Sequence, residues 1–366
     1  MTVKTIAITA LLGSACAAQA GGIDRSGQSI LALFESGRYA EFSLGSVSPD
    51  TSGTAVAGLG GFGSGDMTSS FLQLGAAYKA DINDRLSYAI IYDQPFGADV
   101  DYPTGTGYFA AGSMAELDAH AITGLMRYKF ENNFSVHGGV RVQSIEATAA
   151  VPFVGGYAVT GDRDIGVGYV IGGAYERPDI ALRVALTYNS RIKHDVDTAE
   201  SFGGVPIPGS NTHIETPQSV NLDFQTGIAQ DTLLFGGIRW AEWSEFDITP
   251  VGYQGATGGS SLVSYDNDVF SYTLGVGRRL NDNWSVSASV GYEKSNGGFA
   301  SNLGPTDGYK SLALAAIYTK DNMKITTGIR YINIGDAQTA IPGFAPASNF
   351  EDNHAVAIGV KVGYTF

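Results

Sequence analysis

The stretch that decides the fold is 133-NFSVHGGVRVQ-143, in which apolar residues alternate with polar or small ones. A period of two is typical of a β-strand, because successive side chains point to opposite faces. Phe134 and Val136 fall on one face of this strand, and His137 and Arg141 fall on the other. The stretch therefore predicts a strand with one apolar and one polar face.

The same alternation recurs along the whole chain and predicts about fourteen strands, an even number. The predicted strands are 37–49, 68–80, 83–95, 114–131, 133–150, 164–177, 179–194, 213–229, 231–248, 265–281, 283–297, 307–320, 322–337 and 349–366. Tight polar turns, such as 131–133 and 281–283, alternate with longer loops rich in glycine and proline. Short turns at one rim and long loops at the other are typical of a barrel in the outer membrane.

The length of these strands separates two all-β architectures. A soluble β-sandwich or jelly roll exported to the periplasm would also alternate, but its strands average about five or six residues. The longer strands favour a transmembrane antiparallel β-barrel, since a closed sheet is how strands satisfy their backbone groups in lipid. We therefore expect a barrel of about fourteen strands in the outer membrane of a Gram-negative bacterium.

The first residues are typical of a secretory signal peptide. Lys4 precedes an apolar run at 5–12, and Ala18-Gln19-Ala20 supplies a cleavage site. The alternative of a lipoprotein modified at Cys16 needs a larger apolar residue than Gly13. We predict a signal peptide at 1–20, a short N-terminal hatch segment at 21–36 and the barrel at 37–366.

The polar faces carry cations that must point into the barrel, because a charge facing lipid at mid-bilayer costs about 2–4 kcal/mol. Arg141, Arg183, Arg330, Lys324 and Lys361 lie on these faces. The three arginines are candidates for holding the head group of an anionic amphiphile. The alternative is that the cations pair with carboxylates inside the barrel. The net charge of −14 argues against a nucleic-acid partner.

Several long loops are apolar where exposed loops are usually polar. They are 149–157, 202–208 and 341–346. Candidate residues for capture of a ligand at the outer mouth are Val151, Phe153, Val154, Phe202, Val205, Ile207 and Phe344. These loops predict a hydrophobic ligand; the alternative is that they pack on one another as a lid.

Five segments taken together resemble one family. They are 91-IYDQPFGAD-99, 188-YNSRIKH-194, 216-TPQSV-220, 238-IRWAEWSEF-246 and the closing strand after Asn353-His354. In this order they resemble the FadL/TodX family of outer-membrane transporters for long-chain fatty acids and other hydrophobic compounds. The resemblance implies a fourteen-stranded barrel with an N-terminal hatch and a lateral exit at an inward bend of the third strand.

The bend would fall at Asp93, Pro95, Phe96 and Gly97. Proline lacks the N–H that a ladder needs, and glycine weakens a strand, so the local chemistry agrees with the resemblance.

The hatch departs from the family pattern, because it is short and has no Asn-Pro-Ala motif. We expect Ile30, Leu33 and Phe34 of this segment to contact ligand.

The predicted function is passive uptake of long-chain fatty acids or other hydrophobic compounds, with capture at the outer loops and lateral release at the bend. The alternative is a general diffusion porin for small hydrophilic solutes. Expected partners are hydrophobic small molecules such as fatty acids and hydrocarbons, outer-membrane lipid and lipopolysaccharide. We also expect the outer-membrane assembly machinery to recognise the C-terminal strand ending in Phe366, and the protein to be a monomer.

We expect the protein to have no enzymatic activity, no cofactor and no metal site. The run 58–63 matches G-x-G-x-x-G but lacks the βαβ context that gives the motif its meaning. His194 with Asp195 and Asp197, or His213 with Glu215, has no nucleophile in a recognisable setting. The five histidines are too scattered for a metal site.

Overall fold

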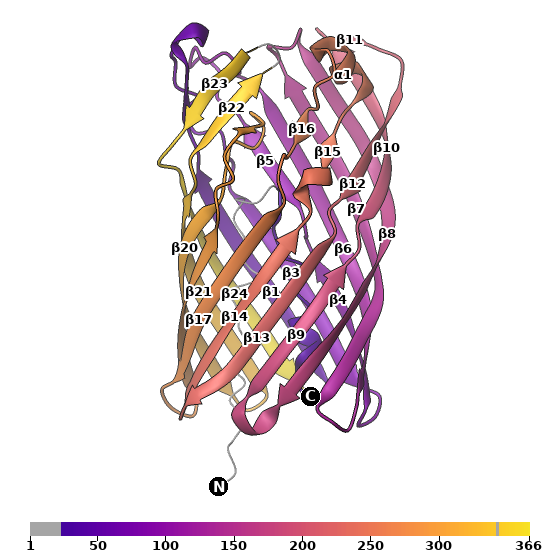
Figure 1. Ribbon diagram of the computed structural model, residues 1–366, viewed down its shortest axis with the longest axis vertical. Coiled ribbons are helices and arrows are strands. Elements are labelled where there is room, and N and C mark those ends of the chain that lie inside the picture. Colours follow the sequence, from indigo (N-terminus) through magenta and orange to yellow (C-terminus); the bar gives the residue numbers. More distant parts are fainter. Residues whose placement is uncertain (1–22, 342–343) are drawn as a thin grey trace.

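The computed structural model describes residues 23–341 and 344–366; the predicted signal peptide at 1–20 lies outside these ranges. Strand β1 (Tyr39–Asp50) pairs antiparallel with β3 (Phe71–Asp81) and with the last strand, β24 (His354–Thr365). The sheet therefore closes on itself as a barrel (Figure 1). The predicted closed, antiparallel barrel of fourteen strands is confirmed.

The other barrel strands follow one another around the wall. They are β4 (Leu86–Asp93), β5 (Gly97–Asp101), β6 (Met114–Lys129), β7 (Phe134–Val151), β8 (Tyr157–Arg177), β9 (Leu182–Asn189), β10 (Ile192–Phe202), β12 (Ser210–Thr216), β13 (Ser219–Ala229), β14 (Thr232–Ala241), β17 (Val269–Arg279), β18 (Trp284–Glu293), β20 (Tyr309–Lys320) and β21 (Met323–Ile334). Three pairs, β4 with β5, β9 with β10, and β12 with β13, are each one barrel strand interrupted by a break.

Short elements build most of the loops at the end of the barrel opposite the C-terminus (Figure 1). They are β2 (Gly53–Ala55), η2 (Ala57–Leu59), β11 (Val205–Pro206), η4 (Trp243–Glu245), β15 (Asp247–Ile248), α1 (Val251–Thr257), β16 (Val263–Ser264), β19 (Phe299–Ala300), β22 (Ala337–Ile341) and β23 (Phe344–Phe350). Two further turns of 3-10 helix, η1 (Leu31–Phe34) and η3 (Pro178–Ile180), lie elsewhere. No helix in the described ranges is long and apolar enough to cross a membrane.

The two faces of the wall differ as the alternation predicts. On β7, Phe134 and Val140 are each 52% exposed on the outside, whereas His137 and Arg141 are buried inside. Because Phe134 and Val140 face outward while His137 and Arg141 are enclosed, this part of the wall has the polarity of a barrel embedded in lipid.

Lumenal cations meet lumenal carboxylates, the alternative that the sequence left open. Lys361 Nζ lies 3.1 Å from Glu41, and Lys324 Nζ lies 3.5 Å from Glu35. Arg127 also pairs with Glu176. These pairs neutralise much of the charge that the strands bring into the barrel.

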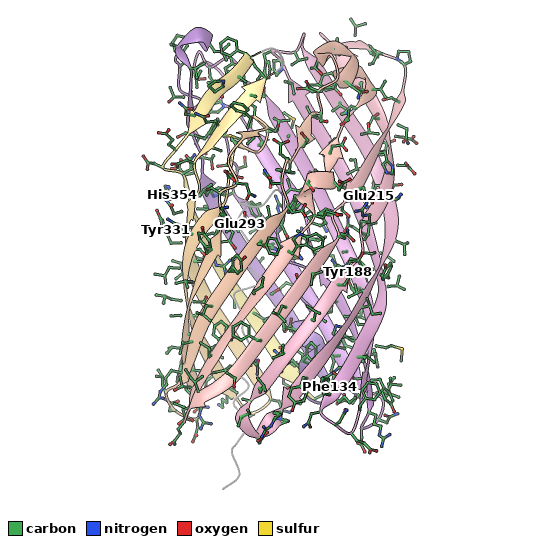
Figure 2. All side chains as sticks on the ribbon, viewed as in Figure 1. Phe134, Tyr188, Glu215, Glu293, Tyr331 and His354 are labelled. Carbon is green, nitrogen blue, oxygen red and sulfur yellow. The ribbon has the colours of Figure 1, made fainter. Side chains whose placement is uncertain are left out.

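Aromatic side chains mark two levels on the outer face. Near the short turns, the ring centroids of Phe134 and Tyr175 lie 4.8 Å apart, and those of Trp284 and Tyr318 lie 5.0 Å apart. Higher up, Tyr331 stacks on His354 at 5.8 Å. Figure 2 shows Phe134 near the turn end and Tyr331 well above it. Aromatic belts at two levels are typical of the two membrane interfaces.

We predict that Val140→Arg destabilises the barrel by about 2–4 kcal/mol, because it places a charge on the lipid-facing surface. Val205→Arg is the matched control, since Val205 is 67% exposed in an outer loop. Unfolding by urea in lipid vesicles measures the difference. Equal stability of the two variants would show that the outer face does not meet lipid.

Candidate functional site

The hydrogen-bonded ladder of the wall is interrupted at the third barrel strand, between β3 and β5. β4 pairs with β3 only through residues 87–92 and 76–81, and β5 pairs with β6 alone. Residues 71–75 of β3 therefore have no ladder on this side. A side chain replaces part of it, since Leu74 N–H donates to Gln94 Oε1 at 2.6 Å. An isolated bridge between Thr68 and Val100 closes the gap above.

The N-terminal segment satisfies the backbone of this bend from inside the barrel. Arg25 N–H donates to the Pro95 carbonyl at 2.8 Å, and Gly97 N–H donates to the Ile23 carbonyl at 2.9 Å. A Cβ on Gly97 would lie 2.3 Å from Arg25 Cζ, so a larger residue here would displace the Arg25 guanidinium from its place beside the bend. Phe96 is buried within the bend.

Polar contacts tie the same segment to two walls of the barrel. Ser26 Oγ donates to Asp93 at 2.5 Å, and Arg25 pairs with Asp99. On the other wall, Arg239 Nε donates to Asp24 Oδ2 at 2.6 Å. The segment thus crosses the lumen as a charged layer in which each of its ionic groups has a partner of opposite sign.

Three predicted hatch residues pack below this layer, towards the short turns. Ile30 and Leu33 are buried against β3 and β4. The ring of Phe34 lies 4.6 Å from the guanidinium of Arg127 and 5.0 Å from that of Arg183. Their contact with a ligand stays a prediction.

An apolar cavity of about 50 Å³ lies beside the bend. Ala98 of the bend and Ile23 of the N-terminal segment form part of its wall. The other walls carry mainly aliphatic and aromatic side chains, among them Leu117, Ala147, Val159, Val196, Ile214, Phe246, Ile248, Leu262 and Leu303. The described lining contains no lysine, arginine or histidine. We call it the apolar cavity.

A second cavity of about 190 Å³, the mouth cavity, shares Leu262 and Leu303 with the apolar cavity. Val151 and Phe153, two of the predicted capture residues, line it. Tyr253 also lines it, and burial raises the pKa of this phenol above its ordinary value, so it stays uncharged. Leu262 and Leu303 thus line both cavities.

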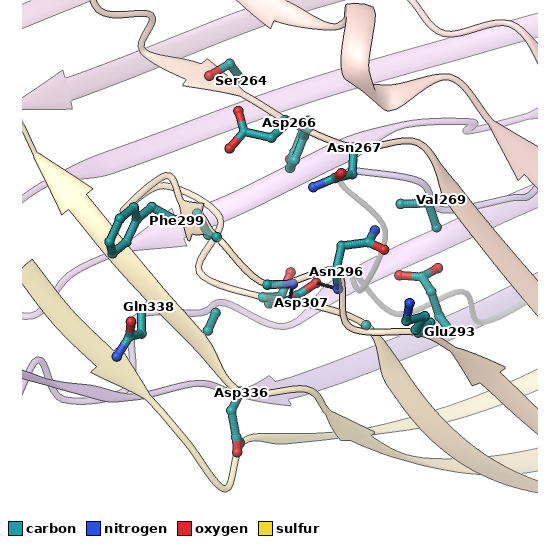
Figure 3. A pocket seen from close by; sticks show the side chains of 18 of the residues that line it. Ser264, Asp266, Asn267, Val269, Glu293, Asn296, Phe299, Asp307, Asp336 and Gln338 are labelled. Atoms are coloured by element: carbon teal, nitrogen blue, oxygen red, sulfur yellow. Dashed lines mark hydrogen bonds between the residues drawn. The ribbon is translucent and has the colours of Figure 1, made fainter. Parts of the chain in front are cut away.

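A third cavity of about 350 Å³, the vestibule, lies among the loops above β17, β18 and β21 (Figure 3). It shares Ser264, Phe299 and Ala300 with the mouth cavity, so the mouth cavity adjoins both of the other cavities. Its ionisable side chains are mostly carboxylates. The carboxylates are Asp266, Glu293, Asp307, Asp336 and Glu351. Lys294 is the one lysine or arginine in the described lining.

The remaining capture candidates are mostly packed into the loops. Val154 and Phe202 pack against the core cluster that contains Tyr157, and the ring of Phe344 lies over Gly58. Ile207 is partly buried against Gly252. Val205 is exposed and lies apart from this cluster. This is the lid packing that the sequence left as an alternative to ligand capture, and the two are compatible.

Sequence reasoning missed Leu262 and Leu303, because they lie in irregular segments between strands. It also placed Phe246 and Ile248 in a strand predicted at 231–248, whereas β14 ends at Ala241 and the chain turns inward. An apolar residue inside a predicted loop was the available signal.

The histidines noted in the sequence have polar partners. His194 Nδ1 lies 3.0 Å from Asp164, and His213 Nδ1 lies 2.9 Å from Asp195. Within the described ranges, no three His, Cys, Asp or Glu residues are grouped so that they could hold a metal ion.

Solved structures with the same architecture are similar to this chain. A Pseudomonas aeruginosa FadL homologue aligns with a TM-score of 0.71 and 14% identity, covering 91% of each chain. The P. putida toluene transporter TodX aligns with a TM-score of 0.68 and 13% identity, covering 92% of each chain. The Ralstonia pickettii toluene transporter TbuX aligns with a TM-score of 0.64 and 12% identity, covering 91% of this chain and 90% of its own.

No curated protein sequence matches the chain. The family model described as outer membrane protein transport protein (OMPP1/FadL/TodX) matches residues 46–366. This match, which spans nearly the whole barrel, shows that the chain belongs to the OMPP1/FadL/TodX family of outer-membrane transport proteins.

Proposed function

We propose that this protein takes up hydrophobic compounds passively, by capture in the outer cavities and lateral release at the bend of the third strand. The carrying observation is the series of cavities: the vestibule, the mouth cavity and the apolar cavity share lining residues, and the last one borders the bend. A concentration gradient is sufficient to drive movement along such a series.

The bend is suited to release into lipid. Ala98 faces the apolar cavity, and on the neighbouring strand Leu72 is 61% exposed on the outside. Because residues 71–75 lack a ladder with β5, separating the strands here breaks few backbone hydrogen bonds. A ligand that leaves at this point stays in apolar surroundings.

The apolar cavity supports an uncharged substrate. No cation lines its described wall, and burying an unpaired carboxylate there would be costly. Arg25 and Arg239, in the layer that borders it, are already paired with Asp99 and Asp24. Two structural neighbours described as toluene transporters are consistent with a neutral hydrocarbon.

Arg141 keeps fatty acids as the second candidate substrate. It is buried, its Nε donates to Thr123 at 2.9 Å, and its Nη1 has no hydrogen-bond partner among the described residues. That donor is suited to a carboxylate. Arg183 and Arg330 were predicted in the same role; Arg183 donates to Gln225 at 3.0 Å.

The outer surface supports the remaining partners. The exposed apolar residues between the aromatic belts would contact outer-membrane lipid and lipopolysaccharide. Phe366 is 64% exposed at the end of the closing strand, where assembly machinery could reach it. We propose that the closed barrel acts as a monomer.

We predict that toluene enters cells carrying this protein at least about tenfold faster than benzoate, because the carboxylate must lose its water in a cavity without cations. Uptake of both labelled compounds is compared with cells that lack the protein. Equal uptake of benzoate would favour the carboxylate role of Arg141, and its loss in Arg141→Met would establish that role.

We predict that Pro95→Val combined with Gly97→Val lowers toluene uptake at least about fivefold, because valine favours an extended strand and its side chain collides with Arg25. Gly124→Val on β6 is the control, since a Cβ there meets no atom within 4 Å. Unchanged uptake in the double variant would refute release at the bend.

A general diffusion porin, the alternative function, would conduct ions steadily. We predict that the purified protein in planar lipid bilayers conducts little, because the N-terminal segment bridges the lumen through Asp24 and Arg25. Deletion of residues 21–30 should raise the conductance. Steady conductance of the intact protein would support the porin instead.

A further inference from the structure

The wall has a second interruption, at the seventh barrel strand. β9 pairs with β8 through Leu182–Asn189, and β10 rejoins β8 only at Thr198–Phe202. The last backbone contact before the gap is Ser190 N–H to the Tyr169 carbonyl at 2.9 Å. Residues 162–168 and 191–197 then face each other without a ladder. We call this stretch the seam.

At the seam, β10 lies on the lumenal side of β8 instead of beside it in the wall. A Cβ on Gly166 would lie 2.4 Å from Ile192 Cγ2 and 2.6 Å from the carbonyl oxygen of Lys193. A Cβ on Gly168 would lie 2.7 Å from Ile192 Cγ1. Glycine therefore lets the backbone of β10 occupy the space where lumenal side chains of β8 would stand.

Side chains hold the seam closed in place of the ladder. His194 Nδ1 lies 3.0 Å from Asp164 across the gap, and the His194 side chain is fully buried. Behind it, Gln143 Nε2 lies 3.3 Å from His194 Nε2 and donates to Thr216 at 3.3 Å. Opening the seam breaks these few contacts, whereas opening an intact ladder would expose a row of backbone groups to lipid.

The seam separates the apolar cavity from the outer surface. Val196 of β10 and Gly161 of β8 line that cavity. On the outside, Ile165 and Val167 of β8 are 64% and 63% exposed, and across the seam the charged side chains of Lys193 and Asp195 on β10 are 68% and 72% exposed. The bend and the seam therefore border one cavity: Ala98 marks the bend of the third strand, and Val196 marks the seam. In Figure 1, β8 and β10 lie along one edge of the barrel.

We propose that the seam is a second lateral route, through which uncharged hydrophobic compounds pass between the apolar cavity and the outer leaflet. The inference rests on the proposed uptake function and adds a site to it. Movement of Ile192 away from Gly166 and Gly168 opens the route, and it leaves the pairing of β10 with β12 intact.

A disulfide across the seam tests this proposal. In Gly168→Cys with Ile192→Cys, the new Cβ of residue 168 lies 2.7 Å from the position of Ile192 Cγ1, which suits a disulfide. The single natural cysteine, Cys16, lies in the predicted signal peptide, so no other thiol competes. Ser135→Cys with Ala174→Cys is the control, because it links paired residues of the intact ladder between β7 and β8.

Toluene uptake into proteoliposomes is measured for both pairs, oxidised and reduced, in the wild-type and Pro95→Val/Gly97→Val backgrounds. We expect the oxidised seam pair to lower uptake in the wild-type background. In the second background it should reduce uptake to the level of empty vesicles, with recovery on reduction. The oxidised control pair should change neither.

The two proposals fail separately. If Pro95→Val/Gly97→Val removes all uptake while the seam is free, the bend is the route and the seam proposal is overturned. If that variant transports normally and the seam lock abolishes transport, release at the bend is refuted and the seam proposal stands. If the oxidised disulfide across the seam changes uptake in neither background, the seam proposal is overturned.

A single substitution covers the case in which the cysteine pair does not fold. Ile192→Cys in proteoliposomes should react with N-ethylmaleimide about tenfold faster than the equally buried Ser135→Cys, because the seam opens locally and the ladder at Ser135 does not. Equal rates would overturn the proposal.

Discussion

A wall in lipid must satisfy its own backbone hydrogen bonds, and the pairing of β1 with β24 makes this possible by removing both edges of the sheet. The interruptions of the ladder described above are exceptions to this rule, and at both of them other groups of the protein approach from inside. Ile23 and Arg25 serve the bend, whereas His194 and Gln143 lie at the seam. At these two places, groups from other segments replace part of the ladder of a neighbouring strand.

The interior of the barrel is divided into a charged layer and an apolar cavity. Asp24, Arg25 and Arg239 belong to a layer whose charges are paired, and the cavity next to it is lined mainly by aliphatic and aromatic groups. A compensated layer presents little net field to a ligand, so affinity comes chiefly from apolar contact. Such contact is tolerant of chemical detail, which suits a carrier of related hydrophobic molecules.

Much of the barrel could be predicted from the sequence, because a period of two is a local property. The predicted strand 133–150 matches β7 at Phe134–Val151 almost residue for residue, and the burial of Arg141 follows from the same pattern. The position of a break in the third strand was also predictable, since Pro95 lacks an N–H and Gly97 lacks a side chain.

The seam could not be predicted in this way. The alternation predicts one continuous strand at 179–194, so the sequence does not indicate a break after Asn189. What interrupts the ladder is the fit of Ile192 over Gly166, a contact between segments far apart in the chain. Leu262 escaped prediction for the same reason, because burial of a loop residue depends on what the distant loops place around it.

The bend of the third strand is held by a piece of chain that is not part of the wall. The carbonyl of Pro95 and the N–H of Gly97 form hydrogen bonds with residues 23–25, which take the place of a neighbouring strand along the bend. Substitutions in residues 23–25 would therefore change how firmly the bend is held in place without altering any strand of the wall.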